Sequence, residues 1–255
     1  MTFNMHKSLN HLLSITAAIF FSQVSQASQA QPAPLNTPIE TTTSDIQFVP
    51  EPPPDQGAPD GRQRGGGTRG DCLAYQGLTA LVPQVEGIVW SQTAIATPSL
   101  FFHVPADLNE AIPLELVIQD SRDDYVFRKQ FSANAAAGTL AVSAGGLQPD
   151  ELYTWTFSIY CDAQSPSNLV YVSGTIERRA DVEVISFSAD ASSAEKLEAL
   201  QQYAAQGIWQ EAIALAIDLF YTEHNDSSQI GAFSSLLEQI GLSDLSLTNS
   251  LYETP

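Results

Sequence analysis

Apolar and polar side chains alternate with a period of two along residues 153–162. This is the period of a β-strand, in which successive side chains point to opposite faces of a sheet. A helix would scatter the same residues around its axis, so the stretch predicts a strand with one buried and one polar face. The buried face carries Tyr153, Trp155, Phe157, Ile159 and Cys161, and the opposite face carries Thr154, Thr156, Ser158 and Asp162.

The residues before this strand resemble a tyrosine corner. Leu147, Pro149 and Tyr153 have the spacing of the corner in fibronectin type III and other immunoglobulin-like sandwiches. In that corner the tyrosine hydroxyl bonds to the backbone a few residues upstream and fixes the turn. We therefore expect structural roles for Tyr153 and for the buried Trp155.

Short runs bounded by proline, glycine and aspartate recur between residues 72 and 180. They cover residues 78–82, 100–104, 114–119, 125–131, 139–143 and 169–177. Several short strands separated by turn residues within about a hundred residues are typical of a sandwich. The pattern predicts a mostly β fold, with an immunoglobulin/fibronectin-III-like antiparallel β-sandwich over residues 72–180. A closed barrel is the alternative.

The hydrophobic period changes to that of a helix in residues 190–245. Ser192 and Glu195 form a capping box that begins one helix, and Gly207 ends it. A third helix runs from about residue 227 to residue 241. Between them, one face of a second helix carries Trp209, Ala212, Ile213, Ala216, Ile217 and Phe220. The first two helices resemble the hairpin of a tetratricopeptide repeat, so the C-terminal part is predicted as such a hairpin plus one helix.

A single hairpin of this kind cannot bury its own apolar face, because about three stacked repeats are needed for such an array to be stable. We therefore expect the stripe that contains Trp209 to pack on the sandwich or on a partner. Trp209 is predicted to be structural.

Residues 1–30 are predicted to be a secretory signal peptide. Lys7 precedes an apolar run over residues 12–21, and small residues follow at Ala27 and Ala30, where cleavage is expected. A membrane anchor is the alternative, but the run is about half of the roughly 20 residues that span a bilayer. We expect no transmembrane span after removal of the signal, and export to the periplasm, the cell surface or the medium.

Residues 31–71 are rich in proline and glycine, and no hydrophobic period survives there. Such a stretch has too little apolar surface to offset its chain entropy, so it predicts a disordered linker. Its arginines, Arg62, Arg64 and Arg69, are candidate binding residues. The neighbouring glycines have the spacing of a dinucleotide-binding loop, but no strand precedes them and no amphipathic helix follows, so that motif is rejected.

The formal net charge is −19, from 29 acidic and 10 basic residues. Removal of Lys7 with the signal peptide makes the protein one unit more acidic. Nucleic-acid binding depends on lysines and arginines that neutralise phosphates, so nucleic acid is not an expected partner. The charge itself is explained most simply as a solvated surface.

Cys72 and Cys161 are the only cysteines. In an exported chain they predict a disulfide, which would close the sandwich. Metal binding by two lone cysteines is the less favoured alternative, and no cofactor is expected. Histidines beyond the signal peptide, His103 and His224, have no serine, cysteine or carboxylate at the spacing of a triad or a metal pair.

The aspartates around residue 120 do not form a calcium loop, because Arg122 stands where an oxygen ligand is needed. A carboxylate-dependent hydrolase would have to use residues such as Asp150, Glu151 or Asp162. Nothing in their spacing identifies an acid and base pair.

The order of several short motifs resembles the cyanobacterial domain of unknown function 928 family. The motifs lie at residues 64–70, 72, 78–83, 101–105, 155–162, 174–178, 207–209 and 240–242. They cover most of the chain beyond the signal peptide, except residues 31–60. The resemblance implies no known activity.

The leading hypothesis is an exported, non-enzymatic binding or scaffolding protein whose partner is an envelope protein or polymer. A sandwich and a helical hairpin are both common interaction modules. The alternatives are a carboxylate-dependent envelope hydrolase and an acidic, calcium-dependent module.

Overall fold

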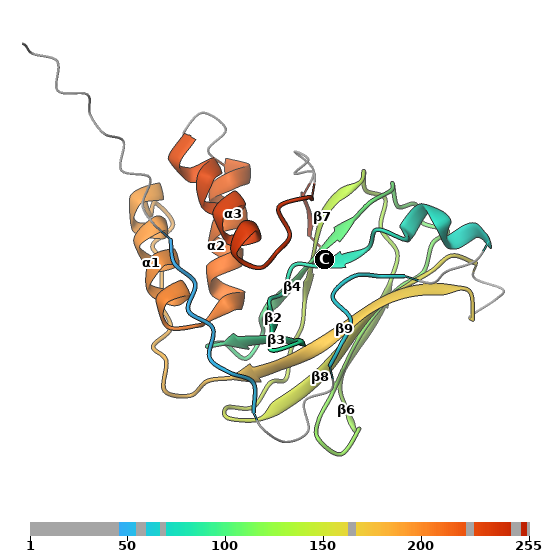
Figure 1. Ribbon diagram of the computed structural model, residues 1–255, viewed down its shortest axis with the longest axis horizontal. Helices are drawn as coiled ribbons and strands as arrows, with labels where there is room; N and C mark the ends of the chain where they lie inside the picture. The colour runs from blue at the N-terminus through green and yellow to red at the C-terminus, as the bar shows by residue number, and fades with distance from the viewer. Residues whose placement is uncertain are drawn as a thin grey trace, which may run out of the picture. The chain divides into compact units, whose positions relative to one another are not determined.

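The computed structural model describes residues 46–54, 60–66, 70–162, 167–222, 227–245 and 251–253. The predicted signal peptide, Arg69 and His224 lie outside these residues. The described part contains two mixed β-sheets and three α-helices (Figure 1). No described helix combines the length and apolar character needed to cross a membrane.

The elements have the following bounds. A 3₁₀ helix η1 covers Gly70–Tyr75, and the first strands are β1 (Thr79–Ala80), β2 (Gln84–Val85), β3 (Ile88–Thr93), β4 (Ser99–Val104) and β5 (Leu114–Gln119). The next strands are β6 (Tyr125–Phe131), β7 (Gly138–Ser143), β8 (Leu152–Tyr160) and β9 (Leu169–Arg178). The helices α1 (Ser193–Ala205), α2 (Trp209–Thr222) and α3 (Ser227–Gln239) follow, and β10 (Leu251–Glu253) ends the described chain.

The strands form a four-stranded sheet of order β1-β4-β7-β10 and a six-stranded sheet of order β2-β3-β9-β8-β5-β6. Each sheet contains one parallel pair, β7 with β10 and β3 with β9. The prediction of a purely antiparallel sandwich is therefore wrong. The sequence does not predict the strand at residues 88–93. Every residue of β3 from Val89 to Thr93 is buried, so both faces of the strand are covered and its sequence does not alternate.

The main core lies between the two sheets. Leu100, Phe102 and Val104 on β4 alternate into it, as their spacing predicts. From the six-stranded sheet, Trp155 and Phe157 on β8 lie against the Phe102 ring, at centroid distances of 6.0 and 4.2 Å. The alternation along residues 153–159 therefore defines the buried face of the central strand.

The four-stranded sheet is covered on its other face by the helices. Leu81, Phe101 and Ala141 belong to a second core with buried residues of α1, α2 and α3. Trp209 is fully buried there, and its Nε1 donates a hydrogen bond of 2.8 Å to the Leu81 carbonyl. The order is thus six-stranded sheet, four-stranded sheet and helices, and the sandwich buries the apolar stripe of α2.

The helix boundaries follow from the capping residues. Ser192 caps α1: its hydroxyl accepts from the Glu195 amide, and the Glu195 carboxylate accepts from the Ser192 amide. Gly207, with a φ of 74°, makes the left-handed turn between α1 and α2. The capping box and the glycine stop are confirmed.

Residues 46–54 differ from the expected disordered linker. The Val49 amide donates to the Ala204 carbonyl of α1 at 3.0 Å, and the Phe48 ring meets Trp209 edge to face at a centroid distance of 4.8 Å. Ile46 is buried, and its carbonyl accepts from the Gln239 side chain of α3. The stretch has no period of its own because it packs on surfaces supplied by the helices.

Residues 60–66 also differ from that expectation, since they pair with one strand of each sheet. Arg62 exchanges two backbone hydrogen bonds with Ser173 of β9, at 2.7 and 2.9 Å. The Gly65 amide then donates to the Leu78 carbonyl, and Arg64 forms a bridge with Thr79 of β1. We call residues 60–66 the seam segment.

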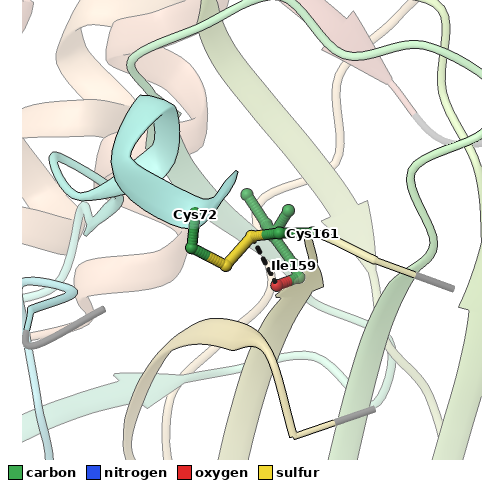
Figure 2. The surroundings of a disulfide bond; sticks show 3 residues. All are labelled: Cys72, Ile159 and Cys161. Carbon is green, nitrogen blue, oxygen red and sulfur yellow. Dashed lines mark hydrogen bonds between the residues drawn. A yellow bond between two sulfur atoms is a disulfide. The ribbon is translucent and has the colours of Figure 1, made fainter. Parts of the chain in front are cut away.

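The predicted disulfide is present. Cys72 on η1 is joined to Cys161, just beyond the end of β8, across a sequence separation of 89 residues (Figure 2). The sulfur of Cys161 lies 3.8 Å from the Ile159 carbonyl oxygen. Tyr153 also contacts the backbone upstream of its strand, because the Gln148 amide donates to the Tyr153 hydroxyl oxygen at 2.8 Å.

Candidate functional site: the outer face of the six-stranded sheet

The six-stranded sheet has an outer face that points away from the main core. Its central strands carry hydroxyl side chains there, because the even positions of β8 face outward. Val117, Thr156 and Ser173 lie directly opposite one another on β5, β8 and β9. The seam segment continues this row, since Arg62 pairs with Ser173.

A hollow of about 390 Å³ lies on this face. Strands β8 and β9 supply its polar lining, the seam segment supplies Arg62, and the turn between β5 and β6 supplies Asp123. The lining consists of Gly61, Arg62, Asp123, Thr154, Trp155, Thr156, Tyr171, Ser173 and Gly174. Its size is within the range of small-molecule sites in proteins, which is about 300–1,000 Å³.

Two glycines in the hollow allow close backbone approach. A Cβ on Gly174 would lie 2.6 Å from the Trp155 ring, and one on Gly61 would lie 2.7 Å from the Ser173 carbonyl oxygen. Gly61 also has a φ of 73°, which side-chain-bearing residues rarely adopt. The seam segment can therefore lie directly against β9 beside the hollow.

The hydroxyl groups in the hollow are not used inside the described part of the protein. Thr154, Thr156 and Ser173 are half-buried, and no intramolecular hydrogen bond engages their side chains there. The Tyr171 hydroxyl also has no hydrogen-bond partner among the described residues. By contrast, Thr175 on the same strand donates its hydroxyl to the Val89 carbonyl at 3.2 Å. The hollow thus gathers polar groups that can donate and accept at once.

Arg62 lies over the Tyr171 ring, with its guanidinium carbon 4.6 Å from the ring centroid. One of its nitrogens donates to the Gly66 carbonyl at 3.3 Å. Within the described chain Arg62 forms no ion pair, whereas Arg64 pairs with Asp244 and Arg179 pairs with Glu51. The contact with the tyrosine ring is a cation–π interaction, and it leaves donors of the guanidinium free for a ligand.

A buried carboxylate lies on the same face beside the hollow. Glu115 accepts from Arg128 at 2.7 Å, from Gln130 at 3.0 Å and from the Tyr160 hydroxyl at 2.7 Å. Burial raises the pKa of Glu115, but the hydrogen bonds from Tyr160 and Arg128 outweigh it and lower the pKa overall. Burial and the neighbouring carboxylate raise the pKa of Tyr160 to about 12. This network ties β5, β6 and β8 together.

The turn between β5 and β6 supplies Asp123 to the hollow of about 390 Å³, and it also lines a second hollow of about 470 Å³ with Asp120, Ser121 and Arg122. Asp120 accepts from the amides of Arg122 and Asp124 and pairs with the Arg122 guanidinium at 2.9 Å. These hydrogen bonds to Arg122 lower the pKa of Asp120. Its oxygens are therefore used within the turn. Within the described residues, no group of three or more histidines, cysteines and carboxylates could hold a metal ion.

Another buried carboxylate lies where α2 meets β3. Glu211 accepts from the Thr93 hydroxyl at 2.6 Å and from the Ala94 amide at 3.2 Å. Beside it, the Gln210 side chain donates to the Ser91 hydroxyl at 2.9 Å. Burial raises the pKa of Glu211 more than these hydrogen bonds lower it. The contacts fix the first turn of α2 against the edge of the sandwich.

The arginines proposed from the sequence do not form one cluster. Arg62 borders the hollow, whereas Arg64 makes a two-pronged ion pair with Asp244, beyond α3. His103 lies near that pair on β4, where burial and the Arg64 charge lower the pKa of the imidazole. Tyr153, Trp155 and Trp209 are all buried. The indole nitrogen of Trp155 is also buried and has no hydrogen-bond partner in the described part of the chain.

The residues that sequence reasoning missed are Tyr171 and Ser173 on β9. Their positions alternate with those of Val170 and Val172, so the sequence pattern alone could have predicted that Tyr171 and Ser173 lie on the outer face. What the sequence did not reveal is the seam segment, whose pairing with β9 places Arg62 on Tyr171. Trp90 on β3 is also buried, and its Nε1 donates to the Glu51 carbonyl at 3.2 Å.

The family model described as Domain of Unknown Function (DUF928) matches residues 64–250. The match spans most of the chain, including the sandwich and the helices, and the chain belongs to this family. No curated protein matches the sequence.

Proposed function

We propose that the chain is an exported, non-enzymatic binding or scaffolding protein of the cell envelope, and that it binds its partner on the outer face of the six-stranded sheet. The single observation that carries the proposal is the hollow on that face. There Thr154, Thr156 and Ser173 leave their hydroxyls unused beside a stacked arginine. Side chains whose polar groups have no internal partner are available to a ligand.

Export is supported by the features of residues 1–30 and by the disulfide. A charged start, an apolar run and small residues are the features of a cleaved signal. Disulfides persist in oxidising compartments and are rare in the cytosol. The protein would therefore act in the periplasm or at the cell surface.

The finer structural relations belong to the same proposal. The hydrogen bond at Tyr153 supports a relation to immunoglobulin and fibronectin type III sandwiches. The short turn at Gly207 supports a likeness of α1 and α2 to a tetratricopeptide hairpin. The order of the sequence motifs supports a cyanobacterial origin.

The hydrolase alternative has weaker support. Asp162 lies beyond one end of β8, and Asp150 and Glu151 lie before the other. At about 3.3 Å per residue, this strand separates them by roughly 30 Å, whereas paired glycosidase carboxylates lie about 5–9.5 Å apart. Asp150 also accepts a hydrogen bond from the Ala180 amide at 3.0 Å.

A pull-down from an envelope extract tests the proposal. Immobilised protein should retain the same partner with and without a metal chelator, and the partner should be recovered chemically unchanged. Loss of the partner with chelator would favour the calcium-dependent alternative. Turnover of a glycan or peptide panel would contradict the non-enzymatic role.

A further inference from the structure

We propose that the hollow on the outer face binds a neutral polysaccharide. This inference rests on the proposed binding function and specifies its ligand class.

The hydroxyl lining is suited to sugar hydroxyls. Thr154, Thr156 and Ser173 can each donate one hydrogen bond and accept others, as a sugar hydroxyl can. The registers place Thr156 opposite Ser173, and Thr154 one outward position further along β8. Outward positions on one strand repeat every two residues, or about 6.6 Å. The face therefore offers hydroxyls in a regular array to a chain with repeating units.

The local charge favours a neutral ligand. The hollow contains one cationic and one anionic side chain, Arg62 and Asp123, so its lining is balanced. The whole chain carries a formal charge of −19 and repels polyanions at long range. A polycation would instead be attracted to the acidic surface in general, with no preference for this hollow. A neutral polymer experiences neither effect.

Arg62 supplies directional donors that no described carboxylate engages, although Asp123 lines the same hollow. Its guanidinium is stacked on Tyr171, and it forms no ion pair with any residue that the structure describes. A guanidinium presents its N–H groups in one rigid plane. These groups can bind uncharged oxygens, such as ring and hydroxyl oxygens of a sugar, at little further ordering cost.

The test uses the purified protein and fractions from the envelope of the cells that produce it. Anion exchange separates the neutral polysaccharides from the acidic ones, and proteins form a third fraction. Each fraction is immobilised and the bound protein is measured. The neutral fraction should retain the protein, with affinity changing less than about twofold between 50 and 500 mM NaCl, because no charge pair is screened.

The matched variants are Thr156→Val with Ser173→Ala, and Thr97→Val as the control. The double variant removes two hydroxyls that have no hydrogen-bond partner among the described residues, so its fold should be retained, as checked by circular dichroism and the unfolding midpoint. Its affinity for the neutral fraction should fall about tenfold, as expected for two lost hydrogen bonds. Thr97 is exposed outside the hollow, so its substitution should not change affinity.

The outcomes separate this inference from the function on which it rests. Retention by the protein fraction alone would overturn the polysaccharide assignment while leaving a binding role intact. Retention by the acidic fraction alone, or equal binding by the folded double variant and the wild type, would also overturn it. Absence of retention by any fraction would contradict the binding function as well.

Discussion

Substitution of Trp209 tests whether the helices and the sandwich unfold as one unit. The side chain is fully buried between α2 and the four-stranded sheet, and it supplies the donor for the Leu81 carbonyl. Trp209→Ala should cost about 3–5 kcal/mol for the lost packing. Leaving the buried carbonyl without its donor adds about 1–3 kcal/mol. Because domains are stable by about 5–15 kcal/mol, this variant could unfold entirely.

Trp209→Phe is the more informative variant, because it keeps most of the ring packing and removes the donor. We expect a loss of about 1–3 kcal/mol. With a urea dependence of about 2–3 kcal/mol per M, the midpoint should fall by roughly 0.3–1.5 M. Phe187→Ala is the control. Phe187 is 38% exposed in the connection to α1, so its substitution should change stability by at most about 0.5 kcal/mol.

The assay follows two probes during urea unfolding. In Trp209→Phe, fluorescence comes from Trp90 and Trp155 in the sandwich, and circular dichroism at 222 nm reports mainly the helices. A single unit predicts that both transitions move together. A helical transition that shifts while the sandwich fluorescence transition stays in place would refute the reasoning and make the helices an independent part.

Three other predictions concern the disulfide, the buried carboxylate of Glu211 and the Phe48 ring. Reduction of the Cys72–Cys161 disulfide should lower the free energy of unfolding by up to about 4–5 kcal/mol in the chain-entropy model. Urea unfolding with and without reductant measures this loss, and an unchanged midpoint would contradict the prediction. The pKa of Glu211 is raised in the folded state, so the folded protein binds the carboxyl proton of Glu211 more tightly than the unfolded chain does. The stability that this protonation contributes is therefore lost as the pH rises through the raised pKa. Glu211→Gln should therefore gain stability relative to wild type with rising pH. If the difference between the unfolding midpoints of the variant and the wild type does not change with pH, this prediction is refuted. Phe48→Ala should cost about 2 kcal/mol, roughly half the value for a fully buried ring. Deletion of residues 31–45 should instead leave the midpoint of thermal unfolding nearly unchanged. Equal effects of the two changes would contradict the packing of residues 46–54.

The strands that alternate were predictable from the sequence. Both β5 and β6 have the bounds that their periodicity predicts, because each borders turn residues and packs apolar side chains against the main core. The strand β3 was not predictable in this way. Its second half is Ser91, Gln92 and Thr93, which are buried because α2 and β9 cover them. A polar strand buried on both faces has no periodic signal.

The linker prediction failed for a related reason. Composition correctly indicates that residues 46–54 and 60–66 cannot form a core of their own. It cannot indicate that Phe48 packs on Trp209 or that Arg62 pairs with Ser173, since both contacts join residues far apart in the sequence. The hydroxyl face of β8 could be predicted, but the hollow that Arg62 and Asp123 complete could not.

The most direct test of the binding face is hydroxyl-radical footprinting of the protein with and without its retained envelope partner. Side-chain oxidation reports exposure, so Tyr171 in the hollow can be compared with Phe187, which is exposed outside it. Our account predicts that the partner protects Tyr171 and leaves the oxidation of Phe187 unchanged. Protection confined to side chains of α1–α3, with Tyr171 oxidised as in the free protein, would contradict it.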